Sequence, residues 1–140
     1  MKKTKTIILL ILTLAMTAGL SSCKGYDEAK CESLTEMIIR GRMLDQNDYA
    51  DMLDQYEDIL KYLIGRSDEI IAEQDQQTRK ELQKRLRNDE EYLKRFGYMF
   101  TFGSALYQAD VANLLDENNS KHYDALESYT DQFAERSAML

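Results

Sequence analysis

The sequence predicts an all-α protein, and three observations carry this prediction. The chain contains no proline and has only five glycines after residue 22, so little in it disfavours helix. Apolar residues recur at spacings of three and four over nearly the whole length from residue 27, which is the period of one helical face. Asp, Asn, Ser and Thr residues suited to helix ends separate these periodic segments. We therefore predict four helices, over about residues 27–43, 46–76, 79–117 and 120–140.

The first two predicted helices meet at Asp45. Helix 27–43 places Cys31, Leu34 and Ile38 on one face. Asp45 followed by Asp48 is a variant of the capping box with an acidic residue in the first turn, so the second helix begins there.

The second helix has the clearest apolar pattern in the chain. Its stripe alternates spacings of four and three: Tyr49, Leu53, Tyr56, Leu60 and Leu63. Gly65 could end the helix as a C-cap residue. Ser67 and Ile71 keep the same register, however, so we predict that the helix continues to about residue 76 with Gly65 inside it.

The third helix is predicted to be long and unbroken. Thr78 and Glu81 match the capping box at its start, and one apolar register runs from Leu82 to about residue 117. Asn118 and Asn119 can take the left-handed conformation that closes such a helix. Ser120 then caps the fourth helix.

These lengths predict an antiparallel four-helix bundle. The second and third helices are much longer than the first and fourth, and short loops make neighbours antiparallel. The two long central helices would therefore continue beyond the bundle as a protruding helical hairpin over about residues 66–95, roughly 20 Å long.

The first 22 residues differ from the rest of the chain. Lys2, Lys3 and Lys5 precede an apolar stretch over residues 7–16, a layout typical of a secretory signal. The apolar part has about a dozen residues, whereas a membrane-spanning helix needs roughly 20. We expect a transient targeting segment.

The end of this segment resembles a known family. The residues Leu20, Ser21, Ser22 and Cys23 form the sequence LSSC, which resembles the lipobox of bacterial lipoproteins. The resemblance implies that a diacylglycerol group is attached to the Cys23 sulfur and that the chain is cut before this residue. Residues 1–22 would then be a signal peptide, 23–26 a lipidated tether and 27–140 a single helical domain. An ordinary secreted protein with a chance cysteine is the alternative.

Lipid would hold the mature protein to a membrane without any hydrophobic span, since several acyl chains together anchor firmly. Lys24 after the lipidated cysteine does not resemble the aspartate that retains some lipoproteins at the inner membrane, which favours the outer membrane. Cys31 would have no partner within the chain. It is either a thiol for a bridge between chains or a small buried apolar residue.

The mature chain would be strongly acidic. Loss of three lysines with the signal leaves 15 basic against 25 acidic residues, a net charge of −10. Such a domain lacks the surplus of cations that nucleic-acid binding needs. A basic protein partner, or simply solubility, fits this charge.

The richest apolar segment is a candidate ligand or partner surface. Its bulky residues are Phe96, Tyr98, Met99, Phe100, Phe102 and Tyr107. They would either form the wall of an apolar pocket or partner groove, or simply form the core of the bundle.

Two charged patterns are further candidates. An acidic strip follows the second helix after Asp45: Asp48, Asp51, Asp54 and Asp58. It would dock a basic partner or be a solvated face; no calcium-loop pattern accompanies it. A basic patch lies in the predicted arm: Arg79, Lys80, Lys84, Arg85 and Arg87. It would contact an anionic surface, or only keep the helix soluble through pairs such as Glu91 with Arg95.

Residue inventory argues against catalysis. His122 is the only histidine and is expected at an exposed helix start, so zinc sites with several His or Cys ligands and paired E-x-x-H di-iron sites cannot be assembled. No cofactor or metal is predicted.

We therefore predict a non-enzymatic, lipid-anchored helical protein that binds another protein of the cell envelope. An immunity protein against an envelope-acting toxin is one concrete form, by analogy of size, charge and fold class. The alternative is a carrier of a small apolar ligand, bound in an aromatic cavity within the bundle. A hydrolase that relies on carboxylates is a third alternative.

Overall fold

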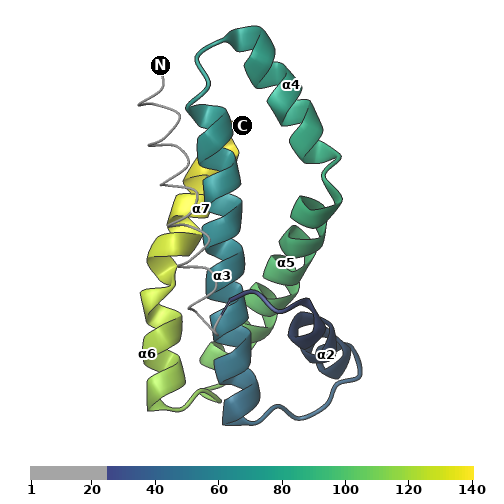
Figure 1. Ribbon diagram of the computed structural model, residues 1–140. Helices are drawn as coiled ribbons and strands as arrows, with labels where there is room; N and C mark the ends of the chain where they lie inside the picture. Colours follow the sequence, from purple (N-terminus) through teal and green to yellow (C-terminus); the bar gives the residue numbers. More distant parts are fainter. Residues whose placement is uncertain (1–24) are drawn as a thin grey trace, which may run out of the picture.

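A computed structural model describes residues 25–140 of the chain. The expected signal peptide 1–22 and Cys23 lie outside the described residues. All regular structure in the described part is α-helical, which confirms the predicted fold class (Figure 1). The helices are α2 (Glu28–Ile39), α3 (Gln46–Ile71), α4 (Gln76–Arg87), α5 (Glu90–Val111), α6 (Glu117–Ala125) and α7 (Glu127–Met139).

Five of these helices begin at an aspartate whose carboxylate accepts a hydrogen bond from the backbone N–H three residues later. The capping residues are Asp27, Asp45, Asp75, Asp89 and Asp116. Each carboxylate satisfies an N–H that has no partner within the helix and complements the helix dipole. The predicted capping box at Asp45 is confirmed, because the Asp48 side chain accepts in return from the Asp45 N–H at 2.9 Å.

The first two helices are shorter than predicted. α2 ends at Ile39 because Gly41 adopts a left-handed backbone with φ of 65°, which turns the chain out of the helix. α3 ends at Ile71, before the expected end near residue 76. Gly65 lies inside α3, as predicted.

The predicted helix start at Thr78 is wrong. The cap is Asp75, whose Oδ2 accepts from the Thr78 backbone N–H at 2.9 Å and from its hydroxyl at 2.7 Å. Thr78 thus lies in the first turn of α4, and its hydroxyl supports the cap.

The predicted continuous helix over 79–117 is also wrong, because it divides at Asn88. Asp89 caps a new helix, α5, through a 3.0 Å hydrogen bond from the Tyr92 N–H to its Oδ1. Its Oδ2 accepts from Arg66 of α3 at 3.2 Å. Asp89 thus caps α5 and also joins its start to α3, at the point where the chain changes direction.

The connection to the C-terminal part differs as well. Asn113 takes the left-handed conformation (φ 58°) after α5, whereas Asn118 and Asn119, expected in this role, lie in α6. α6 starts after Asp116 and not at Ser120. Leu126 separates α6 from α7, so the single helix predicted over 120–140 is divided there.

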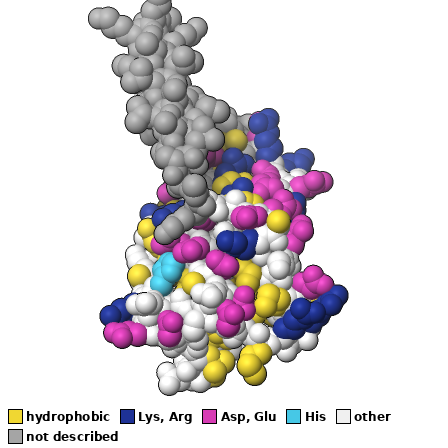
Figure 2. Space-filling view, turned by 60° about the horizontal axis from the view of Figure 1, so that its bottom comes forward, with side chains coloured by type: hydrophobic (Ala, Val, Ile, Leu, Met, Phe, Trp, Pro, Cys, Tyr) yellow, Lys and Arg dark blue, Asp and Glu magenta, His cyan; other side chains and the backbone are white. Residues whose placement is uncertain are grey.

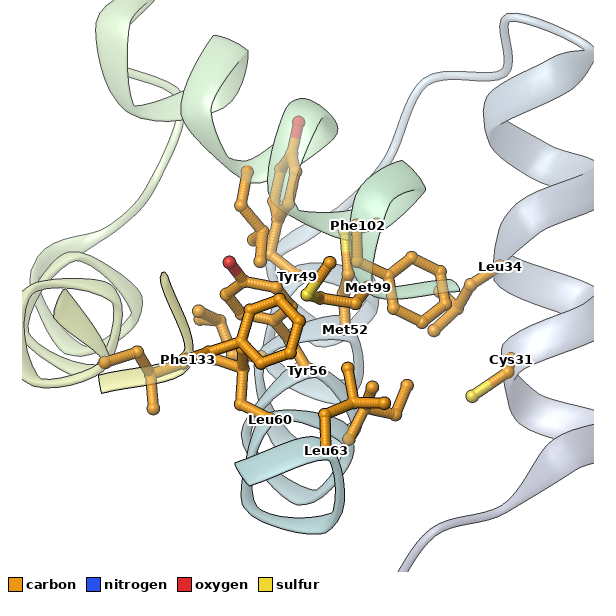
Figure 3. Packing of buried hydrophobic residues seen from close by; sticks show 14 of the residues in the cluster. Cys31, Leu34, Tyr49, Met52, Tyr56, Leu60, Leu63, Met99, Phe102 and Phe133 are labelled. Atoms are coloured by element: carbon orange, nitrogen blue, oxygen red, sulfur yellow. The ribbon is translucent and has the colours of Figure 1, made fainter. Parts of the chain in front are cut away.

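α3 is the central element of the described structure. It contacts each of the other five helices, with α5 and α2 on one side and α6 and α7 on the other (Figure 1). The core lies around its apolar stripe, where Met52, Leu53, Ile59, Leu60 and Leu63 are fully buried. Cys31 and Leu34 of α2 enter this core from one side and Phe133 of α7 from the other (Figure 3).

The expected arm over residues 66–95 does not consist of two helices alone. α7 runs beside the last turns of α3, where Arg136 Nε donates to Asp68 at 3.1 Å. At the end of α7, the Leu140 carbonyl accepts from Gln83 Nε2 of α4 at 3.1 Å. α4 itself buries only Leu86, so it is the most loosely covered helix of this region.

Candidate interaction surface

The aromatic segment of α5 is divided between the core and the surface. Phe102 and Met99 are buried in the core, and Tyr98 stacks on Phe102 with ring centroids 5.9 Å apart. In contrast, Phe100 is 70% exposed and Tyr107 62% exposed. The six predicted residues therefore do not surround a single cavity: Tyr98, Met99 and Phe102 hold α5 to its neighbours, while the others point outward.

The outward side chains form a second apolar stripe on α5. Its exposed members are Leu93, Phe96, Phe100, Tyr107 and Val111. Their spacings of three, four, seven and four place them on one face of the helix. Exposed apolar surface of this extent on one helix is typical of an interaction site.

A groove of about 460 Å³ opens between this stripe and the α6–α7 junction. We call it the α5/α7 groove. Three tyrosines from three helices line it, namely Tyr56 of α3, Tyr107 of α5 and Tyr123 of α6. Gly103 of α5 lies against Tyr56, since a Cβ placed there would meet the Tyr56 hydroxyl oxygen at 3.1 Å. A side chain at position 103 would press on Tyr56, so glycine allows α5 to lie close to this tyrosine.

The rim of the α5/α7 groove is acidic. Its charged lining residues are Asp110, Asp124, Glu127 and Asp131, and no Lys or Arg lines it. Burial, followed by the negative charge of Asp110, raises the pKa of Tyr123. The Tyr123 hydroxyl, which is neutral at pH 7 in any case, therefore adds no negative charge to the groove until well into the alkaline range.

A smaller apolar pocket lies further along the same stripe of α5. It has a volume of about 230 Å³ and includes Leu86 of α4, Leu93 and Phe96 of α5, and Leu140. Phe96 contacts Phe133 of α7, with ring centroids 6.1 Å apart. Along the stripe, the small pocket therefore lies on one side of the contact between Phe96 and Phe133, and the α5/α7 groove lies on the other.

A third hollow of about 570 Å³ lies at the end of the molecule where α3 begins. Leu44, Tyr49 and Ala109 are among its lining residues, and Met43 beside them is 95% exposed. Figure 2 shows hydrophobic side chains lying among acidic and basic ones over this end of the molecule.

The predicted acidic strip lies on one face of α3, but its members have different local roles. Asp48 belongs to the capping box. Asp51 lies 3.4 Å from Lys30 of α2, and Asp54 lies 4.0 Å from His122 of α6. Desolvation raises the pKa of Asp58. The strip is therefore partly used in contacts between helices.

The predicted basic patch lies along α4. Its five cations, Arg79, Lys80, Lys84, Arg85 and Arg87, make no ion pair within residues 25–140. Arg87 also lines the small apolar pocket. The helical pair Glu91 with Arg95, predicted from the sequence, forms at 2.7 Å.

The lone histidine is not at a helix start. His122 lies in the last turn of α6, where its Nε2 is 3.8 Å from Glu57 Oε1 of α3. Within the described range, no group of three or more His, Cys, Asp or Glu residues has the arrangement of a metal site.

Sequence reasoning missed the residues that hold the beginning of the domain. Gln55 of α3 is buried, and its Oε1 accepts from the Asp27 N–H at 2.8 Å and from the Cys31 thiol at 3.4 Å. Its Nε2 donates to the Gly25 carbonyl at 3.3 Å. A polar residue inside an otherwise apolar helical stripe was the available signal.

Arg95 completes this attachment. Its guanidinium carbon lies 3.9 Å from the ring centroid of Tyr26 and 4.0 Å from that of Tyr62, and its Nε donates to Glu91. Cation–π contacts of this kind are worth more when the pair is partly desolvated, as here. The residues directly after Lys24 are thus fixed to α3 and α5.

No protein-family model, no curated protein and no solved structure matches this chain. From residue 25 onward, no helix combines the length and apolarity needed to span a membrane.

Proposed function

We propose that this chain is a lipid-anchored, non-enzymatic protein of the bacterial cell envelope whose helical body binds another protein. The exposed apolar stripe of α5 carries this proposal. Phe100 and Tyr107 project into solvent from a helix whose opposite face already supplies the core. Large aromatic side chains are enriched at protein interfaces because they bury much area with little loss of conformational entropy.

The anchor is proposed at Cys23, on the basis of the lipobox-like sequence LSSC. Only Lys24 separates Cys23 from Gly25, whose carbonyl is bound by Gln55. Two residues of chain span at most about 7 Å. A lipid on Cys23 would therefore hold the body directly at the headgroups, with a tether shorter than the expected 23–26.

We further propose that α2, α3, α5 and the α6–α7 pair act as one four-helix body. α4, with its unpaired cations, would be the projecting part of the hairpin that it forms with α3. The small buried area of α4 and the position of Leu86 as its one buried residue support this division. Lys24 supports placement at the outer membrane.

Membrane fractionation tests the anchor. We expect Cys23→Ser protein to appear in the soluble fraction and to lose incorporation of labelled fatty acid, because the sulfur that accepts the lipid is gone. Cys31→Ala is the matched control and should remain with the membranes. Equal membrane retention of the Cys23→Ser and parent proteins would contradict the proposal.

Site-specific photo-crosslinking in cells tests the interaction. A photoreactive amino acid at Phe100 should give a covalent adduct with a partner protein, since this side chain is exposed in the middle of the stripe. The same amino acid at exposed Glu69 is the control and should give none. If neither position yields an adduct under conditions in which the protein is anchored, the interaction proposal fails.

A further inference from the structure

We infer that the α5/α7 groove is the docking site for a cationic amphipathic helix of a partner protein. This inference rests on the proposed interaction function and names the chemistry of its partner. It is carried by the spacing of the groove walls, by their exposure and by the charge of the rim.

The walls of the groove have the spacing of helical seams. On α5, the lining residues Gly103, Tyr107 and Asp110 follow one another at spacings of four and three. On the opposite wall, Tyr123, Glu127 and Thr130 are spaced by four and three across the α6–α7 junction. Two seams of this kind on either side of a common floor present holes for the side chains of a third helix.

The dimensions of the groove suit a helix of about two turns. From Gly103 to Asp110, the lining part of α5 extends about 10 Å at 1.5 Å per residue. Gly103, at the start of this segment, has no side chain that would narrow the groove, and the Tyr56 side chain lies against it. Phe100 and Tyr107, on either side of Gly103, are mostly exposed and so can lose solvent contact on binding.

The rim specifies the charge of the occupant. Four carboxylates line the groove without any cation among them. An apolar helix with Lys or Arg beside its apolar face would bury the aromatic stripe and place its cations next to these carboxylates. Such complementarity steers encounter and excludes acidic partners.

A second copy of this chain fits the groove less well. The whole chain carries a net charge of −7, so two copies repel one another. Among the helices of residues 25–140, α4 is the one that is strongly basic, but its Leu86 is already buried against its own molecule. This leaves α4 without a free apolar face of the required length.

The test uses a designed helical peptide of about 18 residues, with Leu at the seam positions and Lys beside them. A matched peptide carries Glu in place of Lys. Binding of each labelled peptide to the full chain, reconstituted in phosphatidylcholine nanodiscs, is measured by fluorescence anisotropy against empty nanodiscs. We expect the Lys peptide to bind and the Glu peptide to bind at least about tenfold more weakly.

Charge-reversal variants locate the site. Asp124→Lys together with Asp131→Lys should weaken binding of the Lys peptide about tenfold and strengthen binding of the Glu peptide. The control, Glu32→Lys together with Glu81→Lys, changes the net charge equally at exposed positions outside the groove and should leave both affinities unchanged. Equal circular dichroism spectra and melting temperatures of the two double variants show that both are folded.

Three results would overturn the inference. They are no binding of either peptide, equal weakening by the two double variants, and self-association of the parent chain that the groove variant abolishes in sedimentation velocity. None of them affects membrane retention through Cys23 or crosslinking at Phe100, so failure of this inference can be told apart from failure of the proposed function.

Discussion

The Gln55 side-chain oxygen accepts a hydrogen bond from the Asp27 backbone N–H at 2.8 Å, and this bond joins the start of the domain to the middle of its central helix. The same side chain also holds the Gly25 carbonyl and faces the Cys31 thiol. One buried amide thereby fixes the first described residues of the chain to the core.

Replacing Gln55 should therefore loosen the start of the domain. Gln55→Leu leaves the Asp27 N–H without its partner, and we expect a loss of about 1–3 kcal/mol in the free energy of unfolding. Urea denaturation measures this loss, and amide exchange should become faster at residues 25–31. Gln74→Leu, at an exposed position, is the control and should change stability little.

The cation–π contacts of Arg95 should contribute measurably to the free energy of unfolding. Arg95→Met keeps most of the aliphatic chain but removes the guanidinium from the Tyr26 and Tyr62 rings, so we expect destabilisation of about 0.5–2 kcal/mol. Lys61→Met is the matched control, because Lys61 lies over Tyr129 at a longer 5.4 Å and is exposed. A larger effect at Lys61 than at Arg95 in thermal unfolding would contradict this assignment.

Two helix caps should differ in their effect on stability. Asp89→Ala removes both the Tyr92 cap and the Arg66 ion pair at the start of the core helix α5, and we expect a loss of about 1–2 kcal/mol. Asp75→Ala removes an exposed cap from α4, which buries only Leu86, and should have a smaller effect. Equal midpoints for the two variants in guanidinium titration would contradict the larger contribution of Asp89 to stability.

Replacement by alanine should change the stability of the protein differently at two of its glycines. Gly65 lies inside α3 with open space around its Cβ position, so Gly65→Ala should stabilise the protein by about 0.5–1 kcal/mol. Gly103→Ala gains the same helix propensity but meets the Tyr56 hydroxyl, so it should stabilise less or destabilise. Differential scanning calorimetry of both variants checks the order.

The buried Cys31 should make stability fall at alkaline pH. Burial raises the pKa of its thiol to about 12, from 9.0 for an exposed thiol. Because the unfolded chain loses this proton first, the stabilising contribution is complete below pH 9 and is lost as the pH rises towards 12. In a Cys23→Ser background, Cys31→Ala should flatten the decline in unfolding free energy above pH 9.

The same burial predicts that the Cys31 thiol reacts slowly with thiol reagents. In the Cys23→Ser background, a thiol reagent at pH 8 should modify it only at the rate of unfolding, because the side chain has no exposure and stays protonated. Rapid modification of the folded protein would contradict the placement of Cys31 in the core.

Three features could be predicted because they depend on local interactions: the all-α class, the capping box at Asp45 and the interior position of Gly65. Each depends on neighbours within about one helical turn, which the sequence displays directly. The buried stripe of α3 was predictable for the same reason, since its period is a local property. Burial of Cys31 agrees with its interpretation as a small buried apolar residue.

The tertiary structure decided where the helices break and which aromatics remain outside. The chain divides at Asn88, where Asp89 caps α5 and also binds Arg66, distant in sequence, whereas the local apolar register favoured a continuous helix. Likewise, periodicity placed Phe96 to Tyr107 on a helix, but only the packing of α3 and α2 against α5 determined that Phe102 is covered and Phe100 exposed. Periodicity gives the angle of a side chain around its own helix, whereas burial depends on which neighbour occupies that direction.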